Sequence, residues 1–204
     1  MTSPPTRQTY RPSPPLERWR STGRAEIDEL MEAHRAIGGT GPGRRTATRQ
    51  INHALVVQLA AQFQGYCRDL HDECSGAMVA AAPEDYRPVL SLALLSGRKL
   101  DSQSAQPASL GSDFGRFGFD FWSAVYALGP AYRPRRRRLD QVSTWRNAIA
   151  HQNFRRPATE PVTAGTRPDL PTVRAWRSAV DQLAGGIDQV MYREVTRITG
   201  TEPW

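Results

Sequence analysis

The spacing of the apolar residues is the feature that most limits how this chain can fold. Between 173 and 190 they recur strictly every three or four positions, which is the period of one face of an α-helix. These residues are Val173, Trp176, Val180, Leu183, Ile187 and Val190. The same spacing returns in other parts of the 204-residue chain, and no segment shows the sustained alternation of apolar and polar residues that indicates a β-strand. The sequence therefore predicts an all-α protein.

We expect an up-down bundle of about five or six helices. Periodicity, together with breaks at glycine and proline, places helices at 25–37, 45–82, 84–95, 114–128, 139–153 and 173–199. Asp113 and Thr172 are the expected N-caps of the fourth and the last of these helices, and Gly200 is the expected end of the last. The segments 97–112 and 154–171 are predicted loops.

The length fits one domain, which we expect over 23–200. Residues 1–22 are rich in proline and serine and are predicted to form a disordered tail. The glycine-rich stretch 38–43 is expected to be a hinge-like loop. It is not a phosphate-binding loop, because it lacks the Gly-Lys-Ser/Thr ending and no strand precedes it.

Several classes of protein are excluded by what the sequence lacks. No apolar run approaches the roughly 20 residues that cross a bilayer, and the first residues have no apolar core of a secretory signal. Cys67 and Cys74 lie seven residues apart on one predicted helix, which is about 10 Å and too far for a disulfide. No Cys/His spacing typical of a zinc site is present. We expect buried thiols, no metal, no cofactor, no membrane contact and a cytoplasmic location.

The formal net charge is +7, and 26 of the 27 basic residues are arginine. A GC-rich genome produces the same bias, and this explanation stays open for the excess as a whole. The densest cluster places five positive charges within six residues: Arg133, Arg135, Arg136, Arg137 and Arg138. The cluster is either a solvated linker before the helix at 139–153 or a patch that binds RNA phosphates.

The helix predicted at 139–153 carries the strongest candidate site, formed by Arg146, Asn147 and His151. Asn147 and His151 are four residues apart and therefore share one face of the helix. Arg146 lies about 140° from His151 on an ideal helix. The two side chains can meet if the arginine wraps around the helix, if the helix end loosens, or if a second copy of the chain completes the site.

A helical wheel assigns the faces of this helix. Val142, Trp145 and Ile149 form the stripe that we expect to face the core. The opposite face, with Asn147 and His151, carries only small neighbours: Ser143, Thr144 and Ala150. A face of this kind allows a second helix or a ligand to approach closely.

These residue types fit phosphodiester chemistry. Histidine exchanges a proton near neutral pH, arginine is a forked and permanently charged donor for phosphate, and an amide can orient either of them. Such a set suits the attack of an RNA 2′-hydroxyl on the neighbouring phosphate. The alternative is purely structural: His151 is then a surface or interface residue, and Arg146 pairs with a local acid such as Asp140.

The string Arg146-Asn147-Ala148-Ile149-Ala150-His151 resembles the R-N-x-x-x-H signature of the HEPN superfamily (higher eukaryotes and prokaryotes nucleotide-binding domains). These domains are compact helical bundles, and many are metal-independent ribonucleases or toxins. Four further segments, at 49–54, 65–70, 97–101 and 113–118, are similar to the branch called RiboL-PSP-HEPN. Together they extend the resemblance over about 45–200.

The resemblance implies a homodimer in which two Arg/His helices face each other across one composite cleft. Arg146 would bind or polarise the scissile phosphate, His151 would act as acid and base, and Asn147 would support both. The protein would be a toxin or defence effector that cleaves RNA, restrained by an antitoxin or another partner encoded nearby.

The chain departs from the family at two positions. Some family toxins carry a tyrosine, two residues past the histidine, that a partner nucleotidyltransferase modifies; here Asn153 stands at that position. Gln64 stands where relatives often carry an acid.

Two other functions remain open. One is a catalytically inactive HEPN-like scaffold for RNA binding or dimerisation. The other, weaker, is a helical DNA-binding regulator, for which no helix-turn-helix pair stands out. Among the remaining candidate residues, His53 can line the same cleft, but a capping or packing role is favoured. We expect His34 and His71 to lie on the surface, and the aromatic residues of 114–128 to belong to the core.

Overall fold

The computed structural model describes residues 10–38 and 45–204, and within these ranges every regular element is a helix. The predicted all-α class is therefore confirmed. The α-helices are α1 (Pro14–Arg18), α2 (Arg24–Gly38), α3 (Arg45–Ala81), α4 (Arg87–Leu95), α5 (Lys99–Ser102), α6 (Pro107–Phe114), α7 (Phe121–Tyr126), α8 (Tyr132–Ala150), α9 (Arg155–Thr159) and α10 (Leu170–Thr199). Short helices in segments expected to be irregular raise the number of segments above the predicted five or six. Most of the glycine-rich stretch 38–43 lies outside the described residues.

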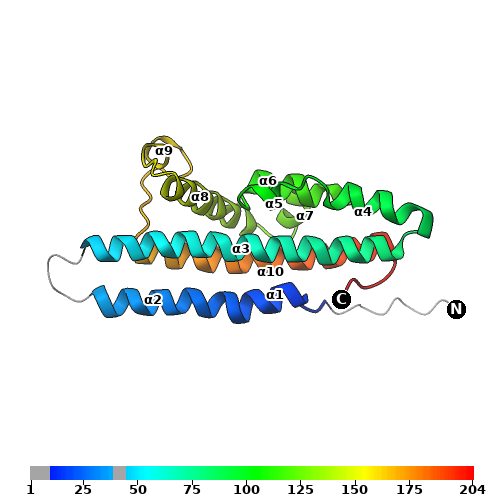
Figure 1. The fold of residues 1–204 in the computed structure, drawn as a ribbon, viewed down its shortest axis with the longest axis horizontal. Coiled ribbons are helices and arrows are strands. Elements are labelled where there is room, and N and C mark those ends of the chain that lie inside the picture. Colours follow the sequence, from blue (N-terminus) through cyan, green and yellow to red (C-terminus); the bar gives the residue numbers. More distant parts are fainter. Residues whose placement is uncertain (1–9, 39–44) are drawn as a thin grey trace.

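The helices lie in three layers (Figure 1). The long helices α3 and α10 run along each other through the middle, α1 and α2 cover one side of α3, and α4 to α9 cover the other side. The hydroxyl of Tyr66 on α3 donates a buried hydrogen bond of 2.9 Å to the carbonyl of Ala184 on α10. This bond fixes the register of the two helices that form the core.

The two long helices follow their apolar spacing. The α10 residues predicted to face the core, from Val173 to Val190, are all buried. α10 begins three residues before the expected start, because Asp169 rather than Thr172 is the N-cap and accepts a hydrogen bond from the Thr172 amide. It ends at Gly200, whose φ of 76° is the left-handed conformation expected of a C-terminal glycine.

The cysteines of α3 are buried free thiols, as expected. Burial raises the pKa of the Cys67 and Cys74 thiols well above their ordinary value. They therefore contribute to the core as small apolar groups.

Residues 10–22 are packed against the bundle and do not form the expected disordered tail; residues 1–9 lie outside the described residues. Leu16 and Trp19 are 0% and 3% exposed. Ser13 caps α1, and its backbone amide donates to the buried carboxylate of Asp188 on α10, which also accepts from the Tyr10 hydroxyl. The composition of this segment, rich in proline and serine, indicated disorder, although the segment contains two core side chains, Leu16 and Trp19, and polar groups that hold it against α10.

The segments 97–112 and 114–128 also differ from expectation. The predicted loop contains α5 and α6, and the predicted aromatic helix breaks at Gly118, whose φ is 85°. Asp113 does not cap that helix. It is buried, and its carboxylate caps α5 by accepting from the backbone amides of Lys99 and Leu100 at 3.1 and 2.8 Å.

His71 is fully buried, so the expectation of a surface residue is wrong. The acids around it suggested a solvated face, but it follows Cys67 by one helical turn and so lies on the core stripe of α3. Its Nε2 lies 3.2 Å from the Asp113 carbonyl and its Nδ1 3.2 Å from the Ser75 hydroxyl, between the rings of Phe114 and Phe117. Burial lowers its pKa to about 4.

This histidine makes the stability of the protein sensitive to acid. In the unfolded chain His71 binds a proton with its ordinary pKa of 6.5, whereas in the folded chain its pKa is about 4. Between these two values the unfolded chain binds more protons, so the stability of the folded chain falls as the pH falls. Urea titrations should show about 2 kcal/mol less stability at pH 5 than at pH 7 from this group. His71→Gln should remove that part of the pH dependence and His34→Gln should keep it. An unchanged pH dependence in His71→Gln would contradict this account.

Candidate active site

Helix α8 carries the residues predicted to form the site, and it packs across both α3 and α10. Its first residue, Tyr132, lies directly against Gly186 of α10, and a Cβ at Gly186 would overlap the tyrosine ring. Only glycine at 186 permits this approach. The direction of α8, and with it the position of its far end, therefore depends on the contact with α10.

Arg146, Asn147 and His151 lie together at the C-terminal end of α8. Arg146 and Asn147 are half-buried, and His151 is exposed and caps the helix, its amide donating to the Asn147 carbonyl at 3.0 Å. The guanidinium of Arg146 donates to the Asn147 Oδ1 at 3.1 Å. The guanidinium of Arg146 thus lies against Asn147, the residue that shares a face with His151.

The helical wheel predicts the buried and exposed faces of α8 only in part. Ser143 and Thr144 were expected on the free face but are 4% and 9% exposed. Ser143 borders a small gap that Leu59 also lines, and α9 packs against α8. Val142 is buried in the core as expected. Trp145 and Ile149 pack against the core as well, but both are half-buried and also line a cleft.

The free face is therefore restricted to the last turn of α8. Asn147 is half-buried there, and Ala150 and His151 are exposed.

A backbone turn immediately after His151 ends the helix. Gln152 has a φ of 53°, the left-handed conformation that glycine usually supplies. The amide of Gln152 donates to the Ile149 carbonyl, and the amide of Asn153 donates to the Ala148 carbonyl at 2.9 Å, which together form a Schellman motif. The chain reverses here, so that Phe154 lies beside the start of α3. A side chain in this conformation costs about 1 kcal/mol, and strain of this kind is common at functional sites.

The arginine cluster lies inside α8 and not in a linker, because the helix begins at Tyr132. Pro134 suggested a linker, but in the first turn its missing amide costs no helical hydrogen bond. Aromatic rings reduce the repulsion between the charges: Arg133 lies over Tyr126 at 4.3 Å, and Arg136 over Trp122 at 5.1 Å.

The five arginines of the cluster differ in their exposure to solvent. Arg135 and Arg136 are half-buried, and the Nε of Arg135 donates to Gln182 at 2.8 Å. Arg133, Arg137 and Arg138 are exposed. Arg138 precedes Arg146 by eight residues, or about 12 Å along the axis. One rigid helix therefore connects the basic cluster to the candidate catalytic residues.

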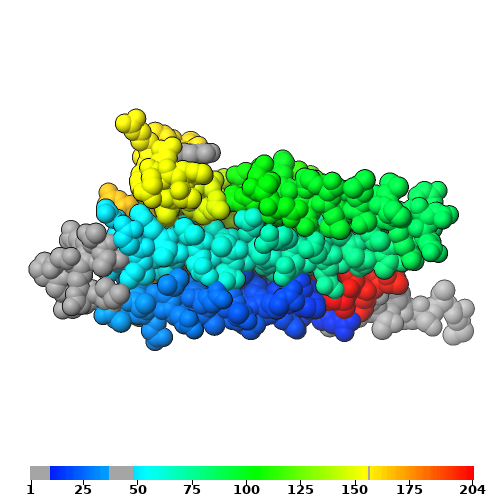
Figure 2. Space-filling view, in the orientation of Figure 1, coloured from blue at the N-terminus to red at the C-terminus, as the bar shows by residue number. Residues whose placement is uncertain are grey.

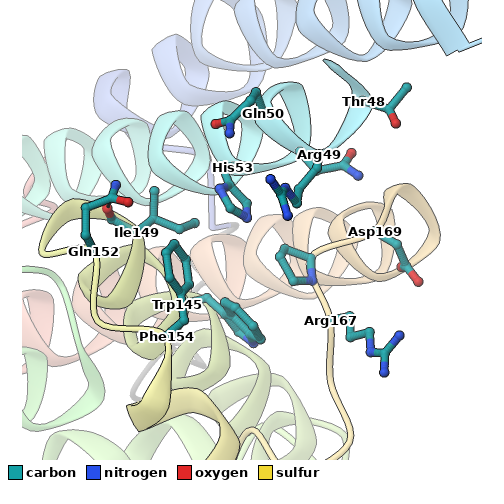
Figure 3. A pocket seen from close by; sticks show the side chains of 12 residues that line it. Thr48, Arg49, Gln50, His53, Trp145, Ile149, Gln152, Phe154, Arg167 and Asp169 are labelled. Carbon is teal, nitrogen blue, oxygen red and sulfur yellow. Dashed lines mark hydrogen bonds between the residues drawn. The ribbon is translucent and has the colours of Figure 1, made fainter. Parts of the chain in front are cut away.

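A cleft of about 730 Å³ lies between the start of α3, the end of α8 and the start of α10 (Figure 3). His53 from α3 stacks on Phe154, with ring centroids 5.6 Å apart and planes at 24°. Figure 2 shows the segment that includes α9 standing out from the surface beside the start of α3. Gln152 lines this cleft and directly follows His151, so the cleft lies next to the candidate catalytic end of α8.

Sequence reasoning missed this cleft. The sequence allows His53 to line the proposed RNA cleft but favours packing or capping. Its position in the cleft found here depends on a contact with a residue about one hundred positions later in the chain. The only local signals were an exposed aromatic, Phe154, directly after the candidate site and a histidine at the start of the longest helix.

The strained turn gives a direct test of how the end of α8 is held. Gln152→Gly should raise the free energy of unfolding by about 1 kcal/mol, because glycine adopts a positive φ without steric cost. The neighbouring control, Ala150→Gly, should lower it by about 0.5–1 kcal/mol, since 150 is a regular helical position. Both are measured by denaturant titration. A loss of stability in Gln152→Gly would show that the turn is not strained.

Within the described ranges, no group of three His, Cys, Asp or Glu residues is placed to hold a metal ion, and none of the helices is long and apolar enough to span a bilayer. Comparisons of the chain with protein-family models, curated proteins and solved structures return no match.

Proposed function

We propose that the protein is an endoribonuclease of the HEPN type that cleaves RNA without a metal ion at the end of α8. The observation that carries the proposal is the contact between the Arg146 guanidinium and Asn147, one helical turn before the exposed His151. This arrangement gathers a phosphate-binding cation and a proton-transfer group on the accessible end of one helix.

The proposed reaction uses these groups in a defined order. His151 removes the proton from an RNA 2′-hydroxyl, whose oxygen attacks the adjacent phosphorus. Arg146 donates to the non-bridging phosphate oxygens as negative charge builds on them. The bond from phosphorus to the 5′-oxygen breaks, and the leaving oxygen takes a proton from a protonated histidine. The products are a 2′,3′-cyclic phosphate and a 5′-hydroxyl.

A second copy of the chain would supply the second histidine. The free face at the end of α8 contains the small Ala150 beside Asn147 and His151, so two such faces can approach closely. In a symmetric dimer each copy presents the same patch to the other. One His151 would then act as base and the other as acid across a shared phosphate.

The biological setting follows from the resemblance. We infer a cytoplasmic toxin or defence effector that acts on RNA, held in check by an antitoxin or another partner encoded nearby. Because Asn153 stands where some family toxins carry a modifiable tyrosine, restraint by modification at that position is not part of the proposal.

The alternative is a catalytically inactive RNA-binding or dimerisation scaffold. It is favoured by one observation: Arg133, Arg137 and Arg138 are exposed at the start of α8. Positive charges near the start of a helix oppose its dipole, and a bound polyanion would relieve that repulsion.

Cleavage of total RNA in the presence of EDTA tests the catalytic proposal. His151→Ala should lower the cleavage rate about 10²–10⁴-fold, because the proton-transfer group is lost. Its circular dichroism spectrum and unfolding midpoint should stay unchanged, because His151 is exposed. His34→Ala is the matched control and should cleave at the normal rate. Full cleavage by His151→Ala would disprove the site assignment, and dependence on a metal ion would disprove the mechanism.

Salt dependence separates the scaffold from the enzyme. Replacing Arg137 and Arg138 by Gln should reduce the slope of log affinity for RNA against log salt by about two, since each removes one phosphate contact. RNA binding with this behaviour, but without any cleavage product from the unmodified protein, would favour the scaffold. An unchanged slope would show that the cluster does not contact RNA.

A further inference from the structure

The cleft between α3 and α8 is not used by the proposed reaction, and its volume of about 730 Å³ is that of a small-molecule site. In Figure 3 the side chains of His53 and Arg49 enter it from α3, while Trp145 and Ile149 line it from α8. The turn after α8 and the segment before α10 complete the lining with Gln152, Phe154 and Arg167.

One wall of the cleft is aromatic. His53 and Phe154 are stacked, and Phe154 is 41% exposed. Trp145 is half-buried, and its indole N–H donates to the Thr166 hydroxyl at 2.9 Å, which holds the ring in place. Burial, together with the positive charge of Arg49, lowers the pKa of His53. The imidazole is therefore neutral at pH 7 and presents an uncharged ring face.

Two of the polar side chains that line the cleft, Arg49 and Asn52, offer groups to a ligand. Arg49 is exposed and has no ion-pair partner among the described residues. Asn52 is only 7% exposed, and its Oδ1 accepts no hydrogen bond. A buried acceptor without a donor is uncommon in proteins, so the Oδ1 of Asn52 can accept a hydrogen bond from a ligand in the cleft.

Flat rings, a free cation and an unsatisfied amide together match the parts of a nucleotide. A base stacks on aromatic rings, its edge exchanges hydrogen bonds with an amide, and its phosphate pairs with arginine. An acidic peptide would form an ion pair with Arg49, but its acidic side chains would not stack on the aromatic rings.

We propose that this cleft binds one nucleotide of a single-stranded RNA, with its base against the rings of Phe154 and Trp145 and its phosphate at Arg49. The inference rests on the proposed function for the source of the nucleotide, since the strand would continue past Gln152 to His151. The cleft then positions the scissile phosphate and gives the enzyme its preference for single-stranded substrate.

Fluorescence anisotropy with a fluorescein-labelled, mixed-sequence single-stranded RNA of twelve nucleotides tests the proposal. All proteins carry His151→Ala, so that no probe is cleaved. Phe154→Ala should bind the RNA about tenfold more weakly, as expected for one lost base stack. Arg49→Gln should lower the slope of log affinity for RNA against log salt by about one.

The matched controls are Tyr86→Ala, which removes an aromatic side chain that is 67% exposed on another part of the surface, and Arg24→Gln on α2. Both controls should bind normally.

Inorganic polyphosphate separates base binding from simple charge attraction. In competition assays its affinity should be the same for Phe154→Ala and for the parent protein, because it has no bases. Affinity for RNA within twofold of the parent in Phe154→Ala, or equal weakening for RNA and polyphosphate, would overturn the proposal.

Failure of the proposed function looks different. Cleavage lost in His151→Ala with unchanged binding in Phe154→Ala would leave the ribonuclease standing without this subsite. Absence of cleavage in the unmodified chain, with weaker binding in Phe154→Ala, would leave the cleft as the site of an RNA-binding protein.

Discussion

The packing of α8 on the pair formed by α3 and α10 is the constraint on which the site depends. Gly186 lets Tyr132 sit directly on α10, and the Tyr66–Ala184 hydrogen bond holds α10 in register with α3. These contacts place the far end of the same helix, because α8 runs without a break for 19 residues from Tyr132 to Ala150. A candidate catalytic group on a helix anchored in this way needs no loop to position it.

The sequence predicts the parts of the fold whose helices bury one continuous stripe. The spacing from Val173 to Val190 defines α10, and the stripe through Phe63 and Leu70 defines α3. Prediction from the sequence fails where a short segment is ordered by contact with a residue that is distant in the chain. Leu16 is held in the core because Asp188, 175 residues after Ser13, anchors the start of α1, and no local pattern reports such a contact.

The candidate site shows the same division. The motif of Arg146, Asn147 and His151 is local, so the sequence predicts which side chains gather at the end of one helix. How much of the opposite face of α8 stays exposed depends on residues that are distant in the sequence, and Ser143 is buried because other elements cover it. The cleft is least predictable, because His53 and Phe154 meet only after the strained turn at Gln152 has reversed the chain.

The chemistry of the RNA ends tests the central claim most directly. Single-stranded RNA incubated with the unmodified protein and EDTA is analysed by mass spectrometry of the fragments. Attack by the 2′-hydroxyl predicts a 2′,3′-cyclic phosphate on one fragment and a 5′-hydroxyl on the other, and no cleavage beside a single 2′-deoxy nucleotide. Fragments with a 3′-hydroxyl and a 5′-phosphate would show that water attacked instead, and would contradict the role assigned to His151.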